Sequence, residues 1–283
     1  MKKIIWISSY PKSGNTFLRI LLSTYFFSFD GIFNQKFLDK IKEYPRDFFE
    51  LALENSIEKE LVSWDEKYRK ISSNNYDYIF LKTHLANVKI NNSSRLIKDN
   101  FTKCILYIYR DPRNIVTSLS EFFNIKIEQA IEYITKKNNI IFSDHKNLKL
   151  SKGFTPILDW ESNFLSYEID AKNIPTVFIK YENLVNNTQS EFVKILKFLK
   201  KFINFEINLE KIARILESTK FNNLINIEKN EGFREKTKMG VKMEKTQFFS
   251  KGISRNYREL LNFDEQRLIT KAFKVTMERL EYK

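Results

Sequence analysis

A short loop of small and polar residues follows the first apolar run of the sequence. It reads Tyr10-Pro11-Lys12-Ser13-Gly14-Asn15-Thr16 and lies between a strand-like and a helix-like segment. At such a turn, consecutive backbone N–H groups and the positive end of the helix point toward one place, which suits a bound anion. Lys12 adds a positive charge and Thr16 a hydroxyl donor. The pattern predicts a phosphate-binding loop; a strand-to-helix turn that binds nothing is the alternative.

The loop differs from the Walker A loop of nucleotide triphosphatases. A Walker A loop has four residues between its glycines and ends in Gly-Lys-Ser or Gly-Lys-Thr. Here Lys12 precedes Gly14, the only glycine of the loop. This difference argues against a nucleotide-dependent kinase of the P-loop type. Such a kinase is kept as the alternative enzyme, and Mg²⁺-dependent ATP turnover would favour it.

Two other apolar runs also end in polar residues that can do chemistry. His84 follows the run that ends near Leu81, and an imidazole can accept a proton near neutral pH. Arg110 follows the apolar run 104–109, and Ser118 comes eight residues later. A guanidinium forms charge-assisted hydrogen bonds to phosphate oxygens, and a serine early in the next helix is a further donor. The second histidine, His145, lies in a polar stretch and is expected to be exposed.

These segments together resemble the sulfotransferases that use 3′-phosphoadenosine 5′-phosphosulfate (PAPS), especially the cytosolic type. The family's 5′-phosphosulfate loop reads Tyr-Pro-Lys-Ser-Gly-Thr/Asn-Thr-Trp, and Phe17 stands here in place of the Trp. The family's Lys-Thr-His-Leu-Pro segment matches residues 82–86, with Ala86 in place of Pro. The resemblance implies that Arg110 and Ser118 hold the 3′-phosphate, as an Arg and a Ser at this spacing do in the family.

The later part of the chain resembles the family more loosely. Tyr181 begins a match to Tyr-Glu-Asp, whose tyrosine contacts adenine, and residues 218–221 resemble the Thr-Ser-Phe segment that flanks the ring. Core packing is the alternative for both. Residues 250–252 resemble the Arg-Lys-Gly that closes over the 3′-phosphate, but Ser250 replaces the Arg, and either Arg255 or Arg258 is a candidate for the missing guanidinium.

The resemblance implies a metal-free transfer from PAPS that releases adenosine 3′,5′-bisphosphate (PAP). Lys12 is assigned to the bridging oxygen, His84 to proton removal, and Lys82 to the sulfuryl oxygens or to the orientation of the site. Ser118 is also expected to engage Lys12 before the acceptor binds. The predicted catalytic residues are Lys12, Lys82, His84 and Ser118. The predicted nucleotide-binding residues are Lys12, Ser13, Gly14, Asn15, Thr16, Phe17, Arg110, Ser118, Tyr181, Thr219, Phe221, Ser250, Lys251 and Gly252.

Strand-like and helix-like segments alternate along the chain, and they must position these residues. This order favours a parallel sheet with helical crossovers. We expect one α/β domain over residues 1–283, a P-loop-like fold of three layers with a central, mainly parallel sheet flanked by helices. Strands are expected at 4–9, 78–81, 104–109 and 176–179, and helices at 16–27, 114–123, 127–136, 157–167, 189–199, 209–216 and 264–273.

Three long segments interrupt the alternation. Residues 28–75 and 120–160 are rich in helix formers, and we expect helical insertions that cap the sheet rather than extend it. Residues 228–258 are basic and weakly patterned, which predicts a mobile lid.

Composition sets limits on the partners. The formal charge of +13 suits an acidic ligand, so a basic nucleic-acid-binding protein is a second alternative. Cys104 is the single cysteine, which excludes an intramolecular disulfide, and we expect a buried, inert thiol. No apolar run reaches the roughly 18 residues of a membrane span, so a cytoplasmic protein is expected. The acceptor, a small molecule or a glycan, and the oligomeric state cannot be read from the sequence.

Overall fold

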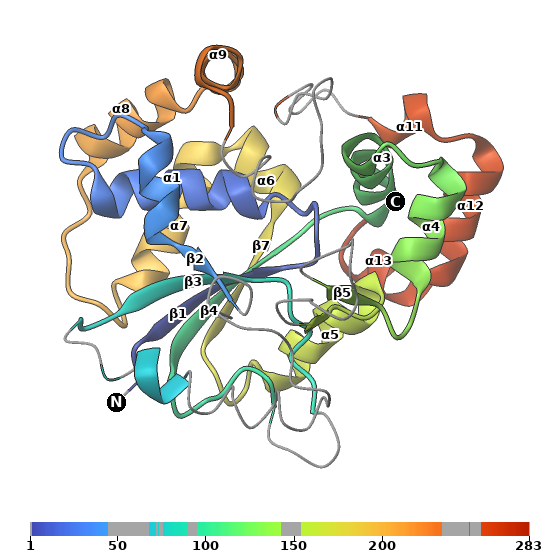
Figure 1. The fold of residues 1–283 in the computed structure, drawn as a ribbon, viewed down its shortest axis with the longest axis horizontal. Helices are drawn as coiled ribbons and strands as arrows, with labels where there is room; N and C mark the ends of the chain where they lie inside the picture. The colour runs from blue at the N-terminus through green and yellow to red at the C-terminus, as the bar shows by residue number, and fades with distance from the viewer. Residues whose placement is uncertain are drawn as a thin grey trace.

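A central parallel sheet organises the chain (Figure 1). The computed structural model describes residues 2–44, 68–71, 73, 76–89, 95–142, 154–233, 249 and 256–282. The sheet has the strand order β2-β3-β1-β4-β7, and every neighbouring pair is parallel. Its strands are β1 (Ile4–Ser9), β2 (Lys42–Glu43), β3 (Ile79–Thr83), β4 (Thr102–Tyr109) and β7 (Thr176–Lys180). The predicted parallel sheet is confirmed.

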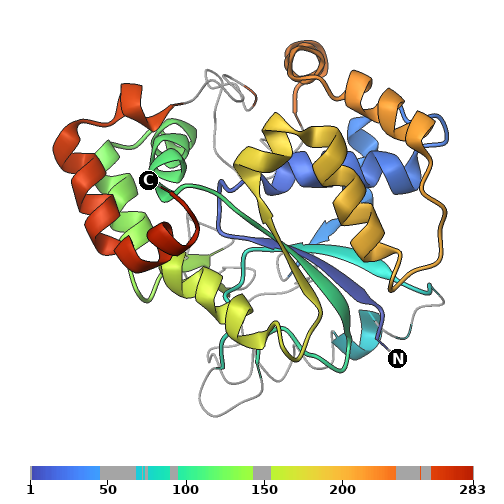
Figure 2. The same ribbon diagram turned by 180° about the vertical axis from the view of Figure 1, so that it is seen from behind.

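Helices cover both faces of this sheet, as the two opposite views show (Figures 1 and 2). One face carries α1 (Asn15–Phe27), α6 (Tyr181–Asn186), α7 (Thr188–Leu199) and α8 (Leu209–Ser218), and the other carries α5 (Trp160–Asp170). The 3₁₀ helix η1 (Gln35–Lys40) and α9 (Phe221–Glu231) lie next to α1 and α8. The predicted arrangement of helices on both sides of the sheet is confirmed.

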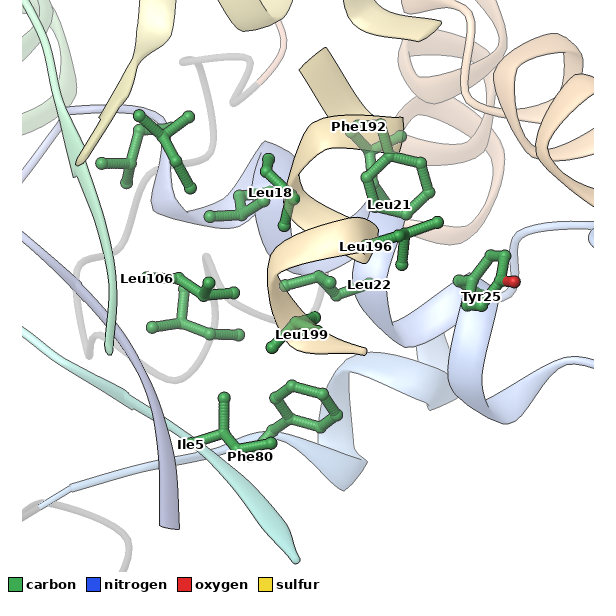
Figure 3. Packing of buried hydrophobic residues seen from close by; sticks show 14 of the residues in the cluster. Ile5, Leu18, Leu21, Leu22, Tyr25, Phe80, Leu106, Phe192, Leu196 and Leu199 are labelled. Atoms are coloured by element: carbon green, nitrogen blue, oxygen red, sulfur yellow. The ribbon is translucent and has the colours of Figure 1, made fainter. Parts of the chain in front are cut away.

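The side chains of the strands alternate between two apolar layers. Ile5 points toward α1 and α7, and Figure 3 shows it among Phe80, Leu106 and the leucines of these helices. Trp6 points to the opposite face, into the cluster that includes residues of α5. Cys104 lies fully buried in the first layer, and burial raises the pKa of its thiol to about 12. The predicted buried thiol is confirmed, and this thiol stays protonated at neutral pH.

A second group of helices packs beside the sheet. It consists of α3 (Pro112–Phe123), α4 (Ile127–Thr135), α11 (Tyr257–Leu260), α12 (Phe263–Ala272) and α13 (Lys274–Arg279), which share one apolar cluster. The C-terminal segment therefore returns to the helix that follows β4 (Figure 2). None of the described helices is long and apolar enough to cross a membrane.

The three segments that interrupt the alternation differ in how their structure compares with the prediction. Residues 28–75 do not only cap the sheet: β2 pairs with Leu81 and Lys82 of β3 and extends it, which corrects the prediction. A strand of two residues is too short to leave a periodic pattern. Within 120–160, α4 is followed by an antiparallel pair, β5 (Ile140–Phe142) and β6 (Phe154–Pro156), so this insertion is only partly helical. Most of the lid predicted at 228–258 lies outside the described residues.

Candidate active site

The loop between β1 and α1 is a tight turn with two left-handed residues. Lys12 has a φ of 65° and Gly14 a φ of 95°. A Cβ atom on Gly14 would lie 2.2 Å from Cδ2 of Tyr181, so only glycine fits against this ring. The backbone N–H of Ser13 donates to the carbonyl of Tyr10 at 3.3 Å and is used within the turn. Gly14 therefore allows the helix to start directly above the ring of Tyr181.

Asn15 anchors this loop to the strand that precedes it. Its Nδ2 donates to the carbonyl of Ile7 at 3.1 Å and to Oγ of Ser9 at 3.2 Å. The side chain is buried, so these bonds fix the first turn of α1 relative to the end of β1. The predicted ligand residue Asn15 has a structural role in the loop.

Three polar atoms around the loop are buried without a hydrogen-bond partner in the described part of the chain. They are Oγ of Ser13, Oδ1 of Asn15 and Nε of Arg110. An unsatisfied buried polar group costs roughly 1–3 kcal/mol, so each of these atoms needs an explanation. The hydroxyl and the guanidinium N–H are donors, which an anion at the loop would satisfy.

Arg110 connects the ends of three strands. Its Nη1 donates to the carbonyl of Lys12 at 3.2 Å, and its guanidinium carbon lies 4.6 Å from the ring centroid of Tyr181. These residues follow β4, β1 and β7 respectively. The guanidinium is almost fully buried, so its positive charge is concentrated beside the loop. The structure brings together Arg110, the loop and Tyr181, as the sequence predicts.

Ser118 lies on α3, and Lys12 contacts the same helix. Ser118 is buried on this helix, two turns beyond Arg110. The ammonium of Lys12 lies 3.6 Å from the ring centroid of Phe122, one helical turn beyond Ser118. This cation–π contact with Phe122 was not predicted, and the contact of Lys12 with Ser118 stays a prediction.

His84 is held at its ring and at its backbone. Nδ1 lies 2.8 Å from the carbonyl oxygen of Ser9 and 3.2 Å from its Oγ. A carbonyl oxygen only accepts, so Nδ1 carries a proton, and the lone pair of the neutral imidazole is on Nε2. The carbonyl of His84 accepts a bond of 3.2 Å from Nδ2 of Asn163 on α5. This tautomer suits a general base that acts through Nε2.

Lys82 forms an ion pair that the sequence did not predict. Its Nζ lies 3.1 Å from Oε2 of Glu43 on β2, and the two side chains are only 12% and 16% exposed. The partner lies 39 residues away in a strand too short to recognise, so no local signal could have found it. Of the two roles predicted for Lys82, the pair favours orientation of the site.

The three residues predicted to contact the adenine ring make different contacts in the structure. Tyr181 contacts the loop and Arg110, as described above. Phe221 is the first residue of α9 and packs with Phe17 against the same buried cluster. The hydroxyl of Thr219 donates to the carbonyl of Ile215 at 2.7 Å and so serves the end of α8. Adenine binding stays a prediction for all three residues.

The third predicted segment is only partly described. Ser250, Lys251, Gly252, Arg255 and also His145 lie outside the described residues. The described part begins just before Tyr257, whose backbone N–H donates to Oδ1 of Asn114 on α3 at 3.1 Å. The guanidinium of Arg258 lies 4.9 Å from the Tyr257 ring. Arg258 thus lies close to α3, and the choice between Arg255 and Arg258 stays open.

Glu182 supports the turn that carries Arg110. Its Oε1 accepts from the backbone N–H of Asp111 at 3.0 Å, and its Oε2 accepts from the hydroxyl of Tyr282 at 3.0 Å. This glutamate matches the motif noted after Tyr181, but its role as a support was not predicted. Tyr282, 100 residues from Glu182 in the sequence, thus helps to hold the end of β4.

Comparisons with known proteins agree on one family. The family model described as "Sulfotransferase domain" matches residues 2–281. Flavonol 3-sulfotransferase of Flaveria bidentis is 23% identical over 284 residues, covering 98% of this chain and 81% of the relative. Amine sulfotransferase of Oryctolagus cuniculus is 23% identical over 220 residues, covering 78% of this chain and 62% of the relative.

Two solved structures share the fold. Mouse sulfotransferase SULT7A1 complexed with PAP matches with a TM-score of 0.57 and 18% identity, over 98% of this chain and 84% of that chain. Retinol dehydratase in complex with retinol and PAP matches with a TM-score of 0.63 and 16% identity, over 98% and 82%. At these identities the likeness shows the fold, and both of those proteins were crystallised with PAP.

Proposed function

This chain belongs to the sulfotransferase family, and from that premise we propose how its residues move a sulfuryl group from PAPS to an acceptor. The site lies at the carboxyl ends of β1, β3 and β4, where parallel strands of an α/β sheet present their ligand-binding loops. The kinase and nucleic-acid-binding alternatives are not favoured, because the family match extends over residues 2–281.

One observation carries the proposal: buried, unpaired donors and a histidine of defined tautomer meet around one loop. Oγ of Ser13 and Nε of Arg110 are buried without a partner in the described chain, beside the start of α1. His84 reaches the same loop through Ser9. The donors fit the phosphate oxygens of a bisphosphorylated nucleotide, and the histidine fits the acceptor side.

When bound, PAPS supplies a sulfuryl group whose S–O bond to phosphate breaks as the acceptor oxygen or nitrogen forms the new bond to sulfur. His84 accepts the acceptor's proton at Nε2 and keeps its Nδ1 proton on the carbonyl of Ser9. Lys12 offsets the negative charge that collects on the departing phosphate oxygen. A donor placed where charge develops lowers the barrier more than it stabilises the bound substrate.

Arg110 and Ser118 would hold the 3′-phosphate, and Lys82 would keep the end of β3 in place through Glu43. No metal enters the proposal, since Lys12 and Arg110 supply the positive charge. A hydroxyl or amine acceptor on a small molecule or glycan, a cytoplasmic location and the absence of nucleic-acid binding stay predictions.

The test is a screen of phenols, alcohols, amines and glycans with PAPS, following release of PAP and the sulfated product. We expect acceptor-dependent PAP release without added Mg²⁺. Mg²⁺-dependent turnover of ATP, with no transfer from PAPS to any acceptor, would contradict the proposal.

A further inference from the structure

Ser9 lies between the donor loop and the proposed base. It is the last residue of β1 and is 1% exposed. Its carbonyl and its hydroxyl oxygen lie 2.8 Å and 3.2 Å from Nδ1 of His84. The same hydroxyl oxygen accepts a bond of 3.2 Å from Nδ2 of Asn15, the first residue of α1. One buried hydroxyl therefore connects the two halves of the site.

The chemistry of these bonds fixes their direction. Nδ1 of His84 must donate, because the carbonyl of Ser9 only accepts. The Asn15 amide also donates, so the hydroxyl oxygen uses its two lone pairs for Asn15 and His84. Both oxygens of Ser9 thus face the Nδ1 proton, and they determine the plane in which the ring lies.

This arrangement has a consequence for proton transfer. When His84 takes a proton at Nε2, the ring becomes a cation, and its Nδ1–H bonds become charge-assisted and stronger. Two oxygens aimed at Nδ1 therefore stabilise the protonated ring more than the neutral ring. The benefit grows as the acceptor gives up its proton, which is the condition for a catalytic effect.

We propose that Ser9 is a positioning residue, which orients His84 for proton transfer and couples it to the donor loop through Asn15; this rests on the base role of His84 proposed above. Ser9 acts through His84. The adjacent Ser8 provides a matched comparison, since it is also fully buried and its Oγ has no hydrogen-bond partner in the described part of the chain.

The kinetic test compares Ser9→Ala, Ser9→Thr and Ser8→Ala in the full chain, normalised to enzyme that binds PAP. Ser9→Ala should lower kcat for a hydroxyl acceptor by about tenfold, the scale of one charge-assisted hydrogen bond, while KM and PAP affinity stay within about twofold. Ser9→Thr keeps the hydroxyl and should restore most of the rate, and Ser8→Ala should stay near wild type. Equal losses in Ser8→Ala and Ser9→Ala would overturn the proposal.

A double mutant distinguishes action through His84 from an independent effect. In a His84→Ala background, Ser9→Ala should cause no further loss of kcat, because the group on which it acts is gone. A further tenfold loss would overturn the role of Ser9 as a positioning residue. An unchanged kcat in His84→Ala alone would instead contradict the base assignment of the proposed function.

A spectroscopic test is independent of turnover. The chain has two histidines, so ¹⁵N-histidine labelling with a His145→Gln variant identifies the signals of His84. We expect a protonated Nδ1 and a non-protonated Nε2 in the neutral ring, with the Nδ1–H resonance shifted in Ser9→Ala and unmoved in Ser8→Ala. The opposite tautomer, or a resonance unaffected by Ser9→Ala, would overturn the contact itself.

Discussion

The loop after β1 and the segment after β3 border the same site but differ in how their polar atoms are partnered. On the loop side, Oγ of Ser13 and Nε of Arg110 are buried without partners in the described chain. On the β3 side, His84 is bonded through its ring and its carbonyl, and Lys82 is paired with Glu43. The first side has donors left for a ligand, and the second is already internally bonded.

This difference separates affinity from turnover. Donors without partners gain a bond only when the nucleotide binds, so changing them should weaken binding. A side chain held in position before binding costs no reorganisation during the reaction, so changing it should slow transfer.

The largest effect is expected at His84. His84→Ala should leave PAP affinity nearly intact and lower kcat for a hydroxyl acceptor by roughly 10²–10⁴-fold, the range for loss of a general base. Stopped assays of sulfated product, normalised to PAP-binding enzyme, measure it. Wild-type kcat should rise with pH as the neutral imidazole becomes populated, and the variant should lack this rise. Near wild-type transfer by the folded variant would remove the base from the β3 side.

Lys12 tests where the division lies, because it belongs to the loop but acts on the leaving oxygen. Lys12→Met should lower kcat by roughly 10²–10³-fold, the scale of one lost transition-state donor, with a smaller effect on PAP affinity. Phe122→Leu is the control: it removes the ring that lies 3.6 Å from the ammonium but keeps the charge. The control should change kcat far less, and a loss as large as that of Lys12→Met would assign the effect to packing.

Arg110 should affect affinity instead of turnover. Arg110→Ala should weaken PAP binding by roughly 10- to 150-fold, the equivalent of 1.5–3 kcal/mol, and leave binding of adenosine 5′-phosphate almost unchanged. Titration calorimetry with the two nucleotides measures the difference. Equal affinity of the wild-type chain for both would contradict the assignment of the 3′-phosphate to Arg110.

Arg113 is the matched control for Arg110 on the next helix. Its Nη2 lies 2.8 Å from Oδ2 of Asp111, and both side chains are buried. Removing one partner of a buried pair is costly, so Arg113→Ala should lower the free energy of unfolding by roughly 3 kcal/mol. In the fraction that remains folded, the preference for PAP should persist. Loss of this preference would show that the guanidinium at 110 is not the specific ligand.

The fold was largely predictable because its strands are covered on both faces. Such strands form continuous apolar runs, and β1 and β4 were located within two residues from this signal. The start of α3 was placed two residues late, at Asn114, since the N-cap is Asp111 and a proline follows it. The two residues of β2 carry no period, so the extension of the sheet was missed.

The residues of the candidate site were predictable only where a short local motif at a strand end identifies them. Lys12, His84 and Arg110 each lie within three residues of a strand end, so motif and position coincide. Asn163 lies 79 residues from the carbonyl of His84 that it binds, and only the packed fold reveals this contact. Ser9 did have a local signal, a hydroxyl at the last position of the strand before the loop.

The smallest effect is expected at Glu43, which tests whether the β3 side is only a support. Its carboxylate lies 3.1 Å from Nζ of Lys82, beside the end of β3. Glu43→Gln keeps a hydrogen-bond acceptor for Lys82 and removes the charge, and the pair retains partial contact with solvent. If Glu43 only orients Lys82, kcat should fall by less than about fivefold, which corresponds to roughly 1 kcal/mol of lost interaction.

Lys82→Met and the double variant Lys82→Met/Glu43→Gln complete the Glu43 test. If the pair acts as a unit, the double variant should lose no more than Lys82→Met alone, because the partner is already gone. Product formation at saturating acceptor measures each rate, and calorimetry with PAP verifies folding. A loss in Glu43→Gln as large as that in His84→Ala would instead make Glu43 part of the proton path, and the β3 side would then contain two reacting groups rather than one base on a fixed support.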